Sequence, residues 1–173
     1  MERRQQRVIE LLDTSGARLH ALLARLTLSE DVVGDLMQEL FMRLSRSDGF
    51  DKARDPYAYA YRAAINLAFA WRRNSRRKSH SLDEIRLPAE NPGSSIDTMI
   101  QAEELQRVLE ATSRLSSLAR HVVVMRYIEQ EPYEEIGRRL GKKPQYVRSL
   151  CSKALAHLRS LLADEGGRAR TRK

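Results

Sequence analysis

Apolar residues recur at steps of three and four along most of the chain, the spacing of one face of an α-helix. The first such stretch runs from Val8 to Leu26 and is interrupted at 14–16, so it predicts one helix or two short ones. A second stripe runs from Val32 to Leu44 and should end before Asp48. Ser29 and two acidic residues precede it, which is typical of a helix start.

Two irregular stretches interrupt this pattern. Residues 46–56 contain turn formers and no apolar stripe, which predicts a loop, with Pro56 in the first turn of the next helix. Alanine-rich residues 57–71 favour that helix. Residues 79–98 hold two prolines, a glycine and several serines and acids, so they predict a flexible linker.

Beyond the linker, helices are expected over Met99–Leu109 and Leu118–Ile128. No alternating pattern of strands occurs, so the sequence predicts an all-α fold. We expect two small helical domains joined by the flexible linker. The predicted divisions are a domain at 1–78, the linker at 79–98, a domain at 99–165 and a basic disordered tail at 166–173.

Residues 133–159, YEEIGRRLGKKPQYVRSLCSKALAHLR, predict two helices around a tight turn. Glu131 can cap the first helix, with Pro132 in its first turn. Gly141 permits a left-handed exit, and Pro144 restarts a helix. This favours either a DNA-reading helix-turn-helix or a basic helical hairpin that packs in the same way.

The second helix of this pair has two distinct faces. Val147, Leu150, Ala154 and Leu158 form its apolar stripe. Its outer face then carries Gln145, Arg148, Ser149, Ser152 and Lys153. Arginine and lysine suit guanine in the major groove, glutamine suits adenine, and phosphates accept any of them.

The charge favours a polyanionic partner. The net charge is +8 and the pI is near 10.0. Residues 1–78 carry +5, residues 79–112 carry −5 and residues 113–173 carry +8. The start lacks the apolar run of a secretory signal, and no segment resembles a membrane span. A lone Cys151 fits a reducing compartment, so we expect a cytoplasmic protein without membrane insertion.

Three segments, in order, resemble bacterial sigma factors of the extracytoplasmic-function (ECF) group, in the sigma-70 superfamily. Residues 133–159 and the helix before them are similar to that family's fourth conserved region. DLMQELFMRLSR, from Asp35, resembles its core-polymerase-binding helix, and YAYAYRAAINLAFAWRRNSRRK, from Tyr57, its promoter-melting helix. The chain departs from the family pattern at Lys142, Lys143, Pro144 and Leu150, and at Ala70 and Arg72 in the melting helix.

The resemblance implies a subunit that binds core RNA polymerase, through the clamp helices of its largest subunit and its flap, and that opens promoter DNA. It implies a monomer within the holoenzyme, associated with the bacterial nucleoid, and it leaves an anti-sigma factor as a further candidate partner. The implied polymerase-binding residues are Asp35, Gln38, Glu39 and Arg43. Their charges alone favour a solvated helix face, and it is the position in the family pattern that favours a polymerase contact.

The implied DNA contacts lie in both domains. On the minus-ten side they are Phe50, Lys52, Arg54, Arg62, Asn66, Arg72, Arg73, Arg76 and Arg77. Phe50 could instead belong to the core. On the minus-thirty-five side they are Arg139, Lys142, Lys143, Gln145, Tyr146, Arg148, Ser149, Ser152 and Lys153. The acidic linker could be a simple tether or could imitate nucleic acid.

Catalysis by this chain is not expected. The four histidines share no ligand spacing, and neither a phosphate-binding loop nor a nucleophile motif occurs, so we expect no catalytic residue, metal or cofactor. Two rival functions remain open. One is a sigma-like mimic that sequesters an anti-sigma factor, and the other is a stand-alone helix-turn-helix regulator.

Overall fold

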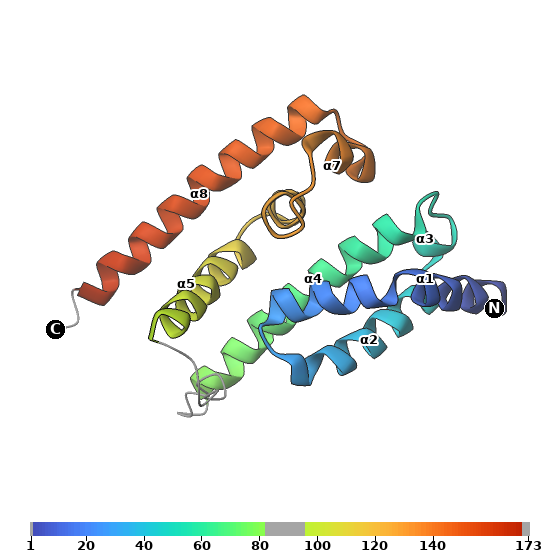
Figure 1. Cartoon of the computed structure of the whole chain (residues 1–173), viewed down its shortest axis with the longest axis horizontal. Coiled ribbons are helices and arrows are strands. Elements are labelled where there is room, and N and C mark those ends of the chain that lie inside the picture. The colour runs from blue at the N-terminus through green and yellow to red at the C-terminus, as the bar shows by residue number, and fades with distance from the viewer. Residues whose placement is uncertain (1, 82–95, 171–173) are drawn as a thin grey trace. The chain divides into compact units, whose positions relative to one another are not determined.

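The computed structural model describes residues 2–81 and 96–170, and these residues form helices without any strand. The chain divides into two compact units, Met1–Glu84 (unit 1) and Ile85–Lys173 (unit 2). All-α architecture is therefore confirmed for the described part of the chain (Figure 1). No helix in the described ranges is long and apolar enough to cross a membrane.

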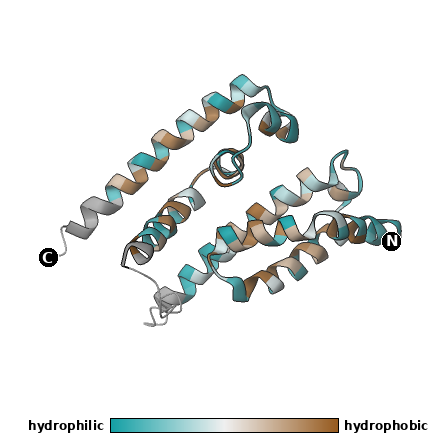
Figure 2. Cartoon of the chain, in the orientation of Figure 1, coloured by the Kyte–Doolittle hydropathy of each residue, from teal (hydrophilic) through white to brown (hydrophobic). Residues whose placement is uncertain are grey.

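Unit 1 is a bundle of three main helices with two short ones. They are α1 (Glu2–Thr27), η1 (Glu30–Val32), α2 (Val33–Arg46), α3 (Asp48–Asp51) and α4 (Pro56–Ser81). α1 packs against both α2 and α4, and α2 packs against α4. Leu19 and Leu40, from the two predicted apolar stripes, are fully buried, as is Ile65 of α4. Figure 2 shows hydrophobic positions recurring along these helices. Hydrophobic burial of these three faces holds the bundle together.

The helices of unit 1 are longer than the sequence predicts. α1 continues without interruption through Gly16. The hydroxyl of Thr14 donates to the carbonyl of Glu10 at 2.8 Å, so this polar side chain is accommodated inside the helix. A mid-helix glycine costs only about 1 kcal/mol, which the packing of the leucines on both sides of it outweighs. The predicted loop at 46–56 also contains the short helix α3.

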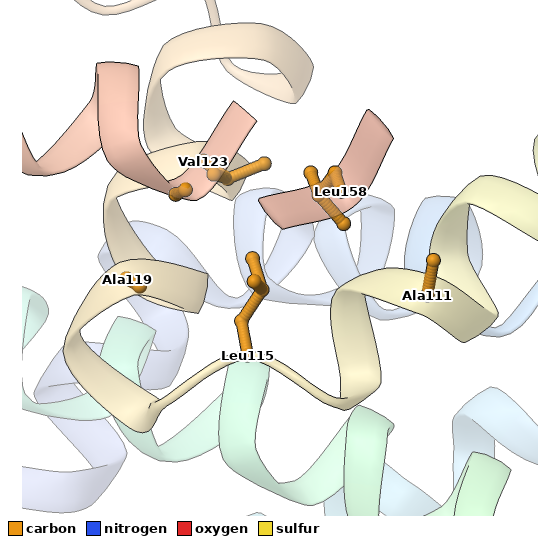
Figure 3. Packing of buried hydrophobic residues seen from close by; sticks show 6 residues of the cluster. Ala111, Leu115, Ala119, Val123 and Leu158 are labelled. Carbon is orange, nitrogen blue, oxygen red and sulfur yellow. The ribbon is translucent and has the colours of Figure 1, made fainter. Parts of the chain in front are cut away.

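Unit 2 holds the C-terminal helices. They are α5 (Ile96–Ser113), α6 (Ser117–Val123), η2 (Val124–Ile128, a π-helical segment), α7 (Tyr133–Leu140) and α8 (Pro144–Arg170). α8 packs against α5, α6 and α7. A core cluster joins α5, α6 and α8, formed by Ala111, Leu115, Ala119, Val123, Ala154 and Leu158 (Figure 3). Small alanines in this cluster let the helices approach closely.

Two predicted boundaries need correction. α4 extends through Ser81 and α5 begins at Ile96, so helices occupy both ends of the predicted linker at 79–98. Its other residues lie outside the described part. α8 continues to Arg170, so a helix occupies most of the segment predicted as a disordered tail, and residues 171–173 lie outside the described part.

Candidate nucleic-acid interface

The turn between α7 and α8 depends on two glycines. Gly141 has φ 63° and ψ 37°, the left-handed conformation that the sequence predicts there. Gly137 lies against the turn: a Cβ on it would be 2.5 Å from the backbone oxygen of Lys142. The N–H of Lys142 donates to the carbonyl of Gly137 at 2.8 Å, which closes the turn. α8 then begins at Pro144, as predicted.

α8 separates a buried face from an exposed one. Val147, Ala154 and Leu158 are buried, together with Cys151, whereas Leu150 is only partly buried. The outer face is exposed along the first three turns. It presents Gln145, Tyr146, Arg148, Ser149, Ser152 and Lys153, with Lys142 and Lys143 exposed on the turn before it. The structure thus brings these candidate residues together on one surface, and their contacts with DNA remain a prediction.

Arg139 does not belong to this exposed surface, which corrects its assignment to phosphates. Its guanidinium pairs with Glu131 at 2.7 Å, and the two side chains are only 12% and 11% exposed. It also pairs with Glu135 at 3.1 Å. Glu131 is therefore not the helix cap that the sequence predicts, because Pro132 occupies the N-cap of α7 without a side-chain hydrogen bond. The pair ties the start of α7 to its last turn.

Tyr133 contacts Arg148, a candidate for the recognition of DNA bases. The sequence did not predict this contact. The guanidinium carbons of Arg148 and Arg126 lie 5.3 Å and 4.8 Å from the centre of the Tyr133 ring. A cation over an aromatic face is attracted to it, which restrains the arginine. Arg126 in turn donates to the carbonyl of Glu131 at 3.0 Å. The one sequence signal for this arrangement was the aromatic residue at the start of α7.

The pKa values of Glu135 and Tyr127 in unit 2 are shifted. Hydrogen bonds from Arg138, and then from Arg139, hold the pKa of Glu135 below its usual range. Partial burial raises the pKa of Tyr127, and the neighbouring Cys151 adds to that shift. No group of three potential metal ligands occurs among the described residues.

The candidate polymerase-binding residues lie together on α2. Asp35 and Gln38 are exposed, and Glu39 pairs with Arg43 at 2.7 Å, four residues further along the helix. Met42 is 44% exposed between them and was not predicted, because the sequence gave only polar and charged residues as candidates for this face. Methionine adapts to irregular partner surfaces. The face therefore combines carboxylates with an apolar side chain.

Two of the minus-ten candidates are buried in unit 1, and their assignment is corrected. Phe50 is 0% exposed, and its ring meets Tyr59 edge-on at 5.9 Å, so it cannot stack on a DNA base. Arg72 is 8% exposed and donates to the carbonyls of Leu26 and Thr27 at 3.2 and 3.4 Å. Its guanidinium satisfies carbonyl groups at the C-terminal end of α1 and does not face a phosphate.

The remaining minus-ten candidates lie on α4 and on the turn before it. Lys52, Arg54, Arg73, Arg76 and Arg77 are exposed, whereas Arg62 and Asn66 are partly buried. Arg62 lies 6.0 Å from the centre of the Tyr59 ring. Exposed arginines and lysines of this kind bind phosphates without requiring a particular sequence.

An exposed basic helix after a left-handed glycine turn is the arrangement of helix-turn-helix DNA-binding domains. The model of Sigma-70 region 2 matches residues 11–78, and that of Sigma-70 region 4 matches residues 111–160. The chain belongs to the sigma-70 family of RNA polymerase sigma factors, within its ECF group.

Two relatives have similar sequences. The chain is 33% identical over 160 residues to the ECF RNA polymerase sigma factor SigE of Mycolicibacterium smegmatis, an alignment that covers 89% of this chain and 61% of that protein. It is 33% identical over 131 residues to the RNA polymerase sigma-E factor of Streptomyces avermitilis, covering 74% of this chain and 69% of that protein.

Among solved structures, the sigma factor RpoE, in complex with the anti-sigma factor NepR from Bartonella quintana, is similar at 20% identity. Its TM-score is 0.48, and the alignment covers 94% of this chain and 98% of that one.

Proposed function

We propose that the chain is a sigma factor that binds core RNA polymerase, directs it to specific promoters and promotes opening of the DNA duplex. The observation that carries this proposal is the exposed outer face of α8 in a chain whose two units both match sigma-70 regions. In this proposal the chain carries out no chemistry itself. It acts as a monomer with the polymerase in the bacterial cytoplasm and nucleoid, through its surfaces.

The surface of α2 is the proposed polymerase contact. Its exposed carboxylate and amide, Asp35 and Gln38, can pair with basic groups of a partner helix, and Met42 supplies apolar contact area. The Glu39–Arg43 pair on the same face is partly exposed and can exchange its internal contact for one with a partner. We assign the four predicted residues and Met42 to this contact.

The DNA contacts divide by unit. In unit 1 the exposed basic residues Lys52, Arg54, Arg73, Arg76 and Arg77 hold the DNA backbone near the minus-ten element, with Arg62 and Asn66 beside them. In unit 2 the α8 face enters the major groove of the minus-thirty-five element, with Lys142 and Lys143 on phosphates. Arg148 and Gln145 are the residues best suited to base edges.

Run-off transcription tests this function. The purified chain is added to core polymerase on fragmented host DNA, and the RNA start sites are mapped. We expect discrete starts that depend on the chain and share an upstream sequence. If the wild-type chain produced no RNA start sites, the proposal would be overturned. A sigma-like mimic or a stand-alone regulator would then be favoured.

A charge reversal tests the polymerase contact separately. Asp35→Arg is expected to reduce binding to core polymerase and all chain-dependent starts together. The matched control is Asp13→Arg, an equal charge change at an exposed position on α1 of the same unit. Equal polymerase binding by the two variants would contradict the assignment of the α2 face.

A further inference from the structure

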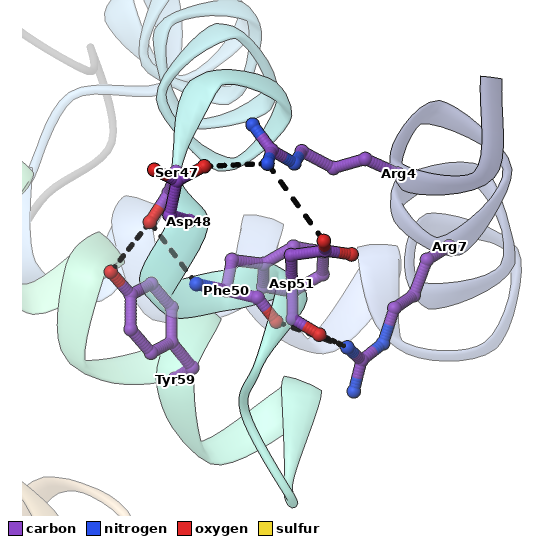
Figure 4. A network of polar contacts seen from close by, with 7 residues as sticks. All are labelled: Arg4, Arg7, Ser47, Asp48, Phe50, Asp51 and Tyr59. Carbon is purple, nitrogen blue, oxygen red and sulfur yellow. Dashed lines mark hydrogen bonds and ion pairs between the residues drawn. The ribbon is translucent and has the colours of Figure 1, made fainter. Parts of the chain in front are cut away.

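The side chain of Arg7, on the first turns of α1, holds the backbone of a turn more than forty residues further along the chain. It donates to the carbonyl of Phe50 at 3.2 Å and also to those of Asp51 and Ala53. Its guanidinium carbon lies 5.5 Å from the centre of the Phe50 ring. Figure 4 shows this side chain reaching from α1 to the end of α3. The single guanidinium group of Arg7 thus binds three backbone carbonyls of this turn.

Arg4, one helical turn earlier, adds charge contacts to the same segment. It pairs with Asp48 at 2.6 Å and lies 3.8 Å from Asp51. Asp48 is 80% exposed, so solvent screens this pair and its contribution is small. Arg7 is half-buried and bonds to backbone carbonyls, which makes it the principal contact.

The opposite side of the turn is fixed by α4. The hydroxyl of Ser47 accepts from the N–H of Phe50 at 3.1 Å and forms a second hydrogen bond with the hydroxyl of Tyr59 at 2.8 Å (Figure 4). Phe50 itself is buried between these two sides. The segment 47–53 is therefore held from α1, from α4 and by its own buried ring. Lys52, on the same segment, and Arg54, directly after it, remain exposed.

We propose that Arg7, assisted by Arg4, is a positioning residue for promoter opening: it fixes the 47–53 turn so that Lys52 and Arg54 meet the DNA backbone in one geometry. The inference rests on the proposed sigma function. Arg4 and Arg7 lie outside residues 11–78, the range that matches Sigma-70 region 2. The opposing interpretation is that Arg7 contacts a phosphate directly through its charge.

The two interpretations respond differently to conservative change. Lysine keeps the positive charge at position 7 but lacks the planar fork that serves several carbonyls at once. A positioning role therefore predicts that Arg7→Lys and Arg7→Gln are both impaired. A phosphate contact predicts that Arg7→Lys retains opening. Arg3→Gln is the matched control, because Arg3 is exposed on the same helix and loses the same charge.

The experiment uses the full chain in holoenzyme. Promoter opening is followed by permanganate reactivity of unpaired thymines, polymerase binding is measured in parallel, and the fluorescence of Trp71, the single tryptophan, reports whether unit 1 is folded. We expect Arg7→Gln and Arg7→Lys to slow opening about tenfold with polymerase binding unchanged, a size typical of losing hydrogen bonds to a charged group. Arg3→Gln should open at the wild-type rate.

Amide hydrogen exchange at 47–53 separates failure of this inference from failure of the proposed function. We expect faster exchange there in Arg7→Gln than in the wild-type chain, a result that needs no polymerase. If the wild-type chain opens no promoter while exchange still accelerates, the proposed function fails and the contact between α1 and the turn stands. Wild-type opening by Arg7→Lys, or unchanged exchange in Arg7→Gln, would overturn the positioning role. Should Arg7→Gln not fold, Arg7→Lys carries both measurements.

Discussion

The two units of the chain differ in how closely their surfaces follow the sequence pattern. In unit 2 the predicted reading residues of α8 are all exposed, because helical periodicity separates them from Val147, Ala154 and Leu158. In unit 1 two predicted DNA contacts, Phe50 and Arg72, are inside the fold. A periodic helix face can be predicted from spacing, whereas an aromatic or arginine in a turn or at a crossing point cannot be placed by its chemistry alone.

The largest expected effect tests the burial of Phe50. Phe50→Ala removes a fully buried ring and should lower the free energy of unfolding of unit 1 by about 3–5 kcal/mol. Urea unfolding followed by Trp71 fluorescence measures it. The matched control, Met42→Ala, truncates an exposed apolar side chain of the same unit and should change stability by less than about 0.5 kcal/mol. Unchanged stability of Phe50→Ala would restore the base-stacking assignment.

A second change tests the turn of unit 2. Gly137→Ala places a Cβ against the backbone oxygen of Lys142, and we expect it to lower the free energy of unfolding by about 1–3 kcal/mol. Circular dichroism during urea unfolding measures the change. Gly34→Ala is the control, because nothing lies within 4 Å of a Cβ there. Alanine in place of glycine within a helix should raise the free energy of unfolding by up to about 1 kcal/mol. Equal effects in the two variants would show that the turn tolerates a side chain.

The third change compares two exposed residues of the same surface. Arg148→Ala should weaken binding to the preferred promoter sequence selectively. The free-energy preference for that sequence over one with a changed base pair should fall by about 1–3 kcal/mol. Lys143→Ala should weaken all sequences alike and lower the salt slope by about 0.9 for the lost phosphate contact. Holoenzyme binding to promoter variants at several salt concentrations measures both. If Arg148→Ala weakened every sequence equally, Arg148 would be a backbone contact.

The smallest effect concerns pH and the exposed surface of α7. Because Arg138 and Arg139 lower the pKa of Glu135 in the folded chain, its contribution to stability is present above the carboxyl's ordinary pKa and is lost as pH falls through the lowered one. We expect Glu135→Gln to reduce the loss of stability on acidification, measured by urea unfolding at neutral and acid pH. An unchanged acid dependence would mean that the carboxylate is not stabilised by its arginines.

Local chemistry explains what the sequence could predict. The left-handed Gly141, the restart at Pro144 and the two faces of α8 all depend on residues within a few positions of one another. The corrected assignments depend on contacts over long separations: Arg72 bonds to Leu26 and Thr27, which no local pattern relates to it. The same reason hid Tyr133 beside Arg148. Continuity of α1 through Gly16 required knowing that its leucines pack on two other helices.

The unbroken α1 has a consequence for where the N-terminal domain begins. Because Arg7 and the buried Leu19 belong to one rigid helix, a single-residue insertion between them would turn Arg7 about 100° away from the segment that it holds. A shortened chain that begins at Leu11 would keep most of the unit 1 core and the whole range that matches Sigma-70 region 2, yet would lose Arg4 and Arg7. Helical register along α1 thus extends the domain by about two turns beyond its matched boundary, from Leu11 back to Arg4.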